Sequence, residues 1–152
     1  MESGYRTISK SVKIFISAKY ISELSGSGGS SLIAESVLEE NKIKLSLSGG
    51  STFIGKINSN NIHISQSGGS ISKISGNTIN LSASLSGASQ IIGPDYVVEY
   101  LDLDLSGASN ANLTVTGEIS ISGSGASLLK YSGTGRVVKS SLSGGSSIKK
   151  VN

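Results

Sequence analysis

The residues of this 152-residue chain that are suited to catalysis are one histidine and a few carboxylates. His63, Ser82 and Asp102 each stand four residues before a Ser-Gly dipeptide, and a serine between a histidine and an aspartate suggests a nucleophilic triad. On stacked strands the three would follow one another at about 4.8 Å. His63 and Asp102 would then lie too far apart for a hydrogen bond, so we expect no catalytic site here.

Asp102, Asp104 and Glu118 form the densest group of carboxylates in the sequence. A calcium ion takes about six to eight oxygen ligands, and three carboxylates on an open strand supply too few. We therefore expect a solvated surface, with no metal site and no cofactor. The weak candidates for a surface row are His63, Asp102, Asp104 and Glu118. The predicted row runs through Lys44, His63, Ser82, Asp102, Glu118 and Lys139.

The composition excludes several other kinds of site. There is no Cys and only one His, which excludes a cysteine nucleophile, a disulfide framework and a metal site of several histidines. The glycine-rich segments 26–29 and 123–126 lack the lysine and the helix of a phosphate-binding loop. Thirteen scattered Lys and Arg, without Trp, do not predict nucleic-acid binding. No apolar run approaches the roughly 20 residues of a membrane span, and no signal peptide opens the sequence.

The sequence is organised by a repeat of Ser-Gly dipeptides. Gly accounts for 20 residues and Ser for 35, yet apolar intervals separate the dipeptides. Successive copies begin 16 to 23 residues apart, with a mean spacing near 20. Self-similarity of this length indicates a solenoid. The seven copies begin at Ser25, Ser48, Ser67, Ser86, Ser106, Ser122 and Ser143.

Apolar and polar residues alternate before each dipeptide, as in segments 43–47 and 101–105. This alternation predicts strands whose residues one, three and five places before the serine point inward. Gln66 occupies an inward place that carries Leu or Ile in other copies, and we predict either a bond to the corner backbone or a local register shift. A second strand and a turn, such as residues 58–61, complete each repeat. A brief helix is predicted over residues 34–40.

One repeat is too small to bury its own apolar face, so the copies must stack. The prediction is an all-β, single-stranded right-handed parallel β-helix (solenoid) of about seven coils, with the hand taken from the rule for parallel crossovers. Residues 1–152 form one domain. Residues 1–24 supply the first coil and an N-terminal capping strand, centred on the apolar segment 12–16, and residues 25–152 supply repeats on a period near 20.

The dipeptide itself has a structural explanation. A sharp corner needs positive φ, which Gly adopts without steric cost, and a larger side chain there would collide with the neighbouring coil. We predict that six glycines stack at this structural corner: Gly49, Gly68, Gly87, Gly107, Gly123 and Gly144.

The seven copies, together with the late segment 131–137 (Tyr-Ser-Gly-Thr-Gly-Arg-Val), resemble the head GIN domain family of auto-transporter adhesins. That family repeats a Ser-Gly motif on a period near 20 and often carries Tyr-x-Gly-x-Pro-x-Val before its last repeat. Gly135 stands here where the family often has Pro. The resemblance covers residues 12–151. It implies a β-helical protein of the cell envelope or the extracellular space, with no established enzymatic activity.

The sequence thus predicts a non-enzymatic structural or adhesin-like module that presents faces rich in Ser, Asn and Thr, with a surface glycan or a protein as its partner. The alternative is a cytoplasmic self-assembling scaffold similar to the bactofilins, and a carbohydrate-active enzyme is a weaker third interpretation. Lys149 and Lys150 would blunt a strand edge, so we expect a monomer or a weak oligomer without long filaments.

Overall fold

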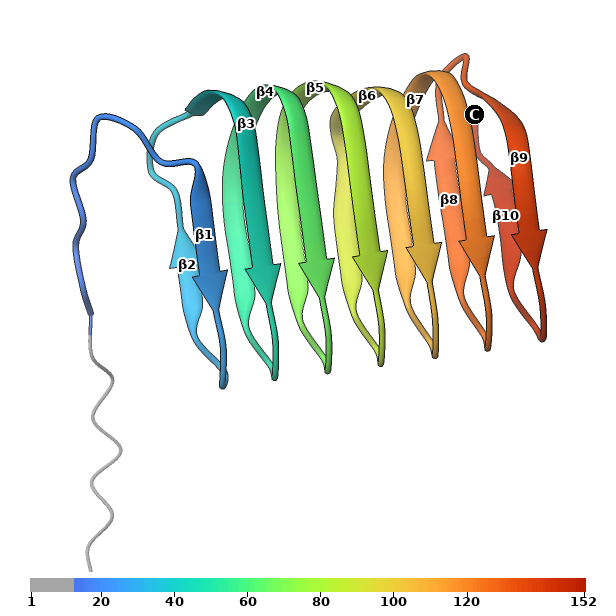
Figure 1. Ribbon diagram of the computed structural model, residues 1–152, viewed down its shortest axis with the longest axis horizontal. Coiled ribbons are helices and arrows are strands. Elements are labelled where there is room, and N and C mark those ends of the chain that lie inside the picture. The colour runs from blue at the N-terminus through green and yellow to red at the C-terminus, as the bar shows by residue number, and fades with distance from the viewer. Residues whose placement is uncertain (1–12) are drawn as a thin grey trace, which may run out of the picture.

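The computed structural model describes residues 13–152, which form a right-handed parallel solenoid of about seven turns (Figure 1). This confirms the predicted fold class. These residues contain ten strands and no helix, and so no helix that could span a membrane. The strands are β1 (Glu23–Gly26), β2 (Ser31–Ile33), β3 (Leu38–Leu47), β4 (Thr52–Gln66), β5 (Ile71–Leu85), β6 (Gln90–Leu105), β7 (Asn110–Gly123), β8 (Leu128–Ser132), β9 (Arg136–Leu142) and β10 (Ser147–Lys150).

Each turn of the solenoid has a front layer and a rear layer. Strands β4 to β7 rise behind, bend over the upper edge and descend in front, where Figure 1 shows their arrowheads. At the two ends of the solenoid the layers are separate strands, with β2 in the rear and β3 in front at the first bend, and β8 in the rear and β9 in front at the last. Most strand residues therefore lie beside their counterparts one turn away: Ile64 pairs with Leu45 on one side and with Ala83 on the other. The register shifts in a few places, as between Gly93 and Val97 of β6.

A four-residue corner, Ser-Gly-(Gly or Ala)-Ser, joins each front strand to the next rear strand at the lower edge. Its first glycine has positive φ, +67° at Gly49, +71° at Gly68 and +69° at Gly107. From the second corner on, the first glycine is the only corner residue with positive φ, as in a type II′ turn. The third corner residue has ordinary φ and can therefore be alanine, as at Ala88. The corners are residues 27–30, 48–51, 67–70, 86–89, 106–109, 124–127 and 143–146.

The stacked corners leave no room for a side chain at the first glycine. A Cβ atom on Gly68 would lie 2.6 Å from the carbonyl oxygen of Gly49. A Cβ atom on the adjacent Gly69 would meet nothing closer than that same oxygen at 4.0 Å. The two positions of one turn therefore differ in both backbone conformation and space.

Gly123 does not occupy this corner, and that part of the prediction is wrong. Gly125, with φ of +74°, takes the corner position. Gly123 lies two residues earlier at the end of β7, between Leu105 and Leu142 of the adjacent turns. With this alignment the corners begin 18 to 21 residues apart, which is more regular than the spacing of the Ser-Gly dipeptides.

The last serine of the corner turns inward, and in four of the seven corners its hydroxyl donates to the carbonyl of the first corner serine. The hydroxyls of Ser30 and Ser127 have no partner within residues 13–152. The buried Ser51 hydroxyl donates to the carbonyl oxygen of Ser48 at 2.8 Å and lies 3.1 Å from that of Gly26. Ser89 donates in the same way to Ser86 at 2.6 Å. The hydroxyl satisfies a carbonyl that the sharp turn leaves without a strand partner, which explains a buried serine in an apolar coil.

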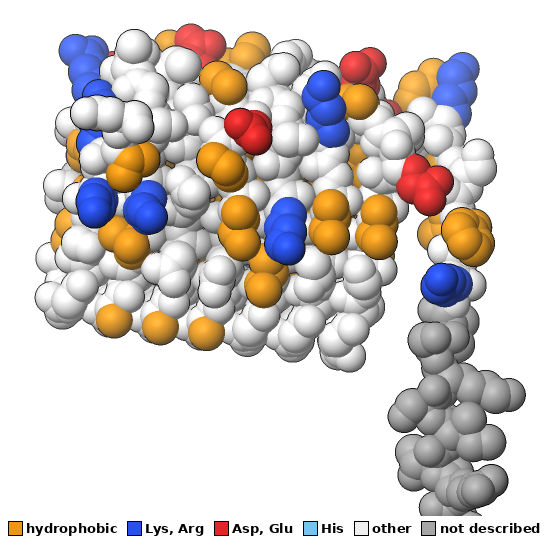
Figure 2. Space-filling view, turned by 180° about the vertical axis from the view of Figure 1, so that it is seen from behind, with side chains coloured by type: hydrophobic (Ala, Val, Ile, Leu, Met, Phe, Trp, Pro, Cys, Tyr) orange, Lys and Arg blue, Asp and Glu red, His pale blue; other side chains and the backbone are white. Residues whose placement is uncertain are grey.

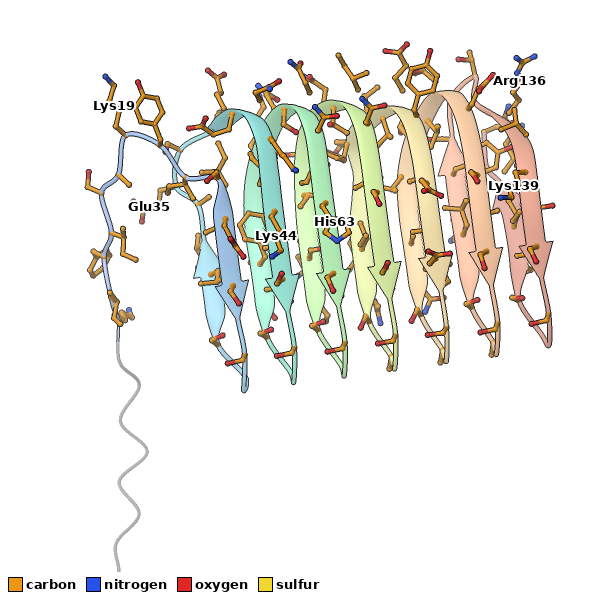
Figure 3. All side chains as sticks on the ribbon, viewed as in Figure 1. Lys19, Glu35, Lys44, His63, Arg136 and Lys139 are labelled. Atoms are coloured by element: carbon orange, nitrogen blue, oxygen red, sulfur yellow. The ribbon has the colours of Figure 1, made fainter. Side chains whose placement is uncertain are left out.

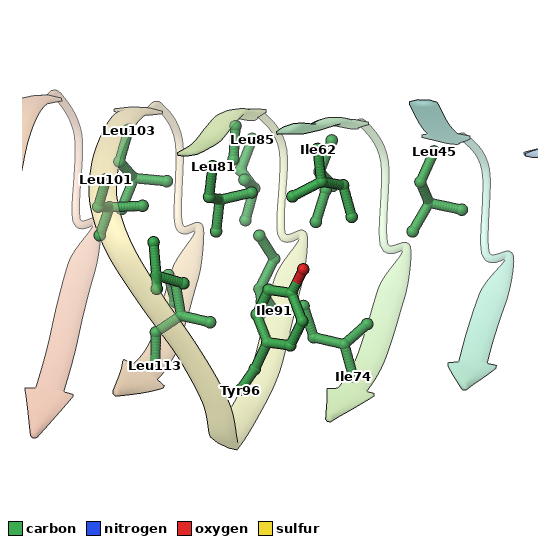
Figure 4. Close-up of a cluster of buried hydrophobic side chains, with 14 of the residues drawn as sticks. Leu45, Ile62, Ile74, Leu81, Leu85, Ile91, Tyr96, Leu101, Leu103 and Leu113 are labelled. Carbon is green, nitrogen blue, oxygen red and sulfur yellow. The ribbon is translucent and has the colours of Figure 1, made fainter. Parts of the chain in front are cut away.

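Between the layers lies a narrow apolar core (Figure 4). Alternate residues of the front strands, such as Leu45, Ile64 and Leu103, are completely buried. The largest buried side chain is Tyr96, whose hydroxyl has no hydrogen-bond partner within residues 13–152. Burial of an Ile or Leu side chain stabilises a fold by about 1.5–3 kcal/mol, so stacking supplies what a single coil lacks.

Gln66 is part of this core and makes no register shift. Its side chain is 2% exposed and spans from the front layer to the rear layer. The amide nitrogen donates to the carbonyl of Gln90 at 3.3 Å, and the amide oxygen accepts from the backbone N–H of Ser72 at 3.2 Å. The small Ser72, between Phe53 and Ile91 in the inward row, leaves the space that Gln66 fills.

The upper edge differs from the prediction in two places. Residues 58–61, predicted as a turn, lie inside the continuous strand β4, which bends there. Residues 34–40 form no helix, because β3 already begins at Leu38.

Among residues 13–152, strands β1 and β2 form the N-terminal end of the solenoid. No strand precedes β1 in the described part of the chain, so the predicted capping strand is not seen over residues 13–16. Ile14, Phe15 and Ile16 are instead 78%, 84% and 79% exposed. Residues 1–12, which include the start of that predicted strand, lie outside the described residues.

The corner geometry predicts that Gly68→Ala destabilises the protein by at least about 2 kcal/mol, because the new Cβ atom combines positive φ with a clash against a backbone oxygen. Gly69→Ala is the matched control and should change stability by less than about 1 kcal/mol, since Ala88 occupies the corresponding place one turn later. Thermal and urea unfolding of both variants measure the difference. Equal midpoints for the two would contradict the stacked corner.

The buried tyrosine predicts a pH effect. Burial raises the pKa of Tyr96 from 10.0 to about 12, an effect that the nearby hydroxyls of Ser59 and Thr78 partly oppose. The folded protein thus favours the neutral phenol, a contribution that is complete below about pH 10 and is lost as the pH rises toward 12. Between about pH 10 and pH 12, the free energy of unfolding of the wild type should fall by about 2 kcal/mol more than that of Tyr96→Phe, which keeps every other ionisable group. Urea unfolding at a series of alkaline pH values tests this, and parallel losses would refute it.

Candidate binding face

The front layer presents three in-register rows of outward side chains, which we call the polar face. Outward residues alternate with buried ones along each front strand, and parallel pairing places each beside its counterpart in the next turn. The upper row is Lys42, Asn61, Asn80, Tyr100, Glu118 and Arg136. The middle row is Glu23, Lys44, His63, Ser82, Asp102, Ser120 and Lys139. The lower row is Ser25, Ser46, Ser65, Ser84, Asp104, Ser122 and Ser141.

The middle row corresponds to the predicted surface row with one correction. Figure 3 shows Lys44 and His63 side by side on neighbouring front strands. Ser120, not Glu118, stands between Asp102 and Lys139. The error has the same origin as that at Gly123, because in this turn the first Ser-Gly lies two residues before the corner.

The polar face brings together no catalytic arrangement among the described residues. Ser82 separates His63 from Asp102, and no side-chain hydrogen bond joins any two of these three within residues 13–152. Asp104 lies in the lower row and Glu118 in the upper row, on either side of Asp102. No group of three His, Asp or Glu in that range has the geometry to hold a metal ion.

Two ion pairs bridge adjacent turns on this face. Lys44 Nζ lies 3.0 Å from a carboxylate oxygen of Glu23, and an Arg136 guanidinium nitrogen lies 3.1 Å from Glu118. All four side chains are half exposed or more, so each pair contributes at most about 1 kcal/mol to stability. Asp102 and Asp104 form no ion pair within the described part of the chain, which leaves their charges available to a ligand.

The polar face is hollowed in two shallow places that share Asn80 and Ser82 and therefore join into one trough along the solenoid. Tyr100, which is 45% exposed, lies in the trough beside the carboxylates. The first hollow is lined by Lys42, Lys44, Asn61, Ile62, His63, Asn80 and Ser82. The second is lined by Asn80, Leu81, Ser82, Tyr100, Leu101, Asp102, Glu118, Ser120 and Val138.

Asparagine side chains form ladders above the trough. Asn80 Nδ2 donates to Asn61 Oδ1 at 3.1 Å, and Asn60 Nδ2 donates to Asn41 Oδ1 at 2.7 Å. A similar bond at 3.3 Å joins Asn77 to an asparagine of the preceding turn. Each ladder fixes its amides in one orientation, so the upper rim of the polar face presents ordered donors and acceptors.

The rear layer carries a different surface. Figure 2 shows Lys and Arg side chains there among separate hydrophobic side chains. Its outward row at mid-height contains Ile54, Lys73, Ile92, Asn112 and Lys130. The polar trough is thus specific to the front.

Sequence reasoning did not place Tyr100 beside the carboxylates, and it missed the asparagine ladders. The signal for the ladders was present, since Asn41, Asn60 and Asn61, Asn80 repeat at intervals of 19 residues. Tyr100 carries no such mark, because only the pairing of β6 with β5 and β7 shows that it lies among Asn80, Asp102 and Glu118.

The comparisons with known proteins agree with the geometry. Neither the curated proteins nor the solved structures contain a match to this chain. The family model described as "Putative auto-transporter adhesin, head GIN domain" matches residues 1–135, which is most of the sequence. The chain therefore belongs to the head GIN domain family of auto-transporter adhesins.

Proposed function

We propose that this protein is a non-enzymatic, adhesin-like module of the cell envelope or the extracellular space that binds a surface glycan through its polar face. Membership of an adhesin-like family supports the general role and the location. The observation that carries the proposal is the trough, a run of hydroxyl, amide and carboxylate groups held in register on a flat sheet.

The chemistry of the trough suits sugars. Sugar hydroxyls bond to Asn and Ser side chains and to free carboxylates such as Asp102, while an exposed aromatic ring such as Tyr100 packs against the apolar face of a sugar ring. Because successive turns are about 4.8 Å apart, an extended glycan that lies along the solenoid reaches polar side chains of several turns at once. Each contact is weak, and several contacts along one chain raise the affinity by multivalency.

The trough predicts that Tyr100→Ala combined with Asp102→Ala removes most binding on a glycan array, with signals on the bound glycans falling on the order of tenfold. Both side chains are outward on strand β6, so the melting temperature should stay close to that of the wild type. Lys73→Ala combined with Asn112→Ala on the rear layer is the matched control and should bind as the wild type does. Equal loss in both double variants would place the ligand elsewhere, and no wild-type binding to any glycan would refute the proposal.

The same face predicts an absence of turnover. Incubation with cell-wall and plant polysaccharides should release no reducing ends and no unsaturated products, because His63, Asp102 and Glu118 are dispersed over an open surface. A product that the wild type releases and that a triple alanine variant of these residues does not would show the protein to be an enzyme.

A further inference from the structure

The corners are joined by a regular set of backbone hydrogen bonds, which from the third corner on number three from each turn to the turn before it. The second corner makes two of the three, from Ser48 N to Gly26 O and from Thr52 N to Ser30 O. In the first bond, the N–H of the first corner serine donates to the last residue of the front strand one turn earlier. In the second, the N–H of the third corner residue donates to the first glycine of the preceding corner. In the third, the N–H of the first residue after the corner donates to the last serine of the preceding corner. At the third corner these bonds run from Ser67 N to Leu47 O at 3.0 Å, from Gly69 N to Gly49 O at 2.8 Å and from Ile71 N to Ser51 O at 2.9 Å. The same bonds recur at the last corner, from Ser143 N to Gly123 O at 2.9 Å, from Gly145 N to Gly125 O at 2.7 Å and from Ser147 N to Ser127 O at 2.9 Å.

This set is unfinished at both ends of the described chain, and the two unfinished ends are complementary. The first corner has donors without an acceptor within residues 13–152, and the last corner has acceptors without a donor there. All but Ser146 belong to exposed residues. The free donors are the N–H groups of Ser27, Gly29 and Ser31. The free acceptors are the carbonyl groups of Leu142, Gly144 and Ser146.

The inward side chains of the two ends match as well. Gly123 lies between two leucines, Leu105 and Leu142. The Leu142 side chain occupies the space that the glycine leaves, since a Cβ atom on Gly123 would lie 2.8 Å from Leu142 Cδ2. Gly26 holds the same inward place in the first turn and has a leucine, Leu47, on one side only. Leu142 is 40% exposed at the other end, so Leu142 of a second copy beside Gly26 would reproduce the arrangement around Gly123.

The charges at the two ends of the middle row are also complementary. Glu23 stands at its N-terminal end and Lys139 at its C-terminal end. In the same row Glu23 pairs with Lys44 of the following turn at 3.0 Å. A Lys139 side chain from a second copy would approach Glu23 from the opposite side, so the contact joins opposite charges.

We propose that a second copy of this chain stacks head to tail on the first, with the corner at residues 143–146 of one copy bonded to the corner at residues 27–30 of the next. The register continues that within the chain, so Lys139 meets Glu23 and Leu142 meets Gly26. Ile14, Phe15 and Ile16 are 78–84% exposed, so within the described chain a second copy would displace few contacts of this segment. Lys149 and Lys150 add positive charge to the joint, which keeps the association weak and the chains short.

Sedimentation velocity across a concentration series tests this proposal. The sedimentation coefficient of the wild type should rise with concentration, whereas Lys139→Glu and Glu23→Lys should each weaken association on the order of tenfold by placing like charges at the joint. An equimolar mixture of the two variants should recover association, because every end then meets its opposite charge. Such recovery distinguishes a head-to-tail joint from side-by-side contact.

Lys73→Glu, a Lys→Glu change on the rear layer in the middle of the solenoid, should associate as the wild type does, and circular dichroism confirms that each variant is folded. A wild type that stays monomeric at every concentration, variants that associate as the wild type does, or a mixture that does not recover would each overturn the proposal. The stacking test changes residues at the two ends of the middle row, whereas the glycan test changes Tyr100 and Asp102 in the middle of the solenoid, so the two results can be told apart.

Discussion

The structure depends on the close approach of one backbone oxygen to the corner of the following turn. The carbonyl oxygen of Gly49 accepts a hydrogen bond from Gly69 N at 2.8 Å and lies 2.6 Å from the place where a Cβ atom of Gly68 would stand. A bare corner is therefore a condition for the hydrogen bond, and the hydrogen bond holds successive turns one strand spacing apart. Once that spacing is fixed at the lower edge, the front and rear strands pair in parallel along their length.

Pairing in register has opposite effects on the two sides of the sheet. Inside, the leucine and isoleucine side chains stack on their counterparts in the adjacent turns. A polar residue in such a stack needs hydrogen-bond partners of its own, as at Gln66, whose amide reaches across to Ser72 and Gln90. Outside, similar polar groups are brought side by side, which forms the asparagine ladders and the serine row. The flat and ordered polar face therefore follows from the same constraint that builds the core, and it forms without the help of any loop.

The period and the alternation in the sequence were sufficient to predict a parallel solenoid, since both report directly on stacking and burial. They were insufficient for the detailed register, because a Ser-Gly dipeptide has the same letters at a strand end and at a corner. In the segment 122–127 two such dipeptides follow each other, and only the positive φ of Gly125 identifies the corner. Because the corner begins at Ser124 and not at Ser122, the middle-row residue four places before it is Ser120, and Glu118 falls in the upper row. The four-residue string Ser-Gly-(Gly or Ala)-Ser, which occurs seven times, separates the alternatives. The bend through residues 58–61 escaped prediction because asparagine, common in turns, is held in a strand here by its ladder.

Strands of this protein contact almost entirely the strands of adjacent turns, and no element within residues 13–152 ties one end of the solenoid to the other. The overall length is therefore not set by the closure of a core. Insertion or deletion of one whole repeat, cut at equivalent corner residues, would join surfaces that already match and would leave every remaining turn with its usual neighbours. The number of repeats can vary by duplication without the redesign of any turn, and the reach of the polar face changes in steps of one strand spacing.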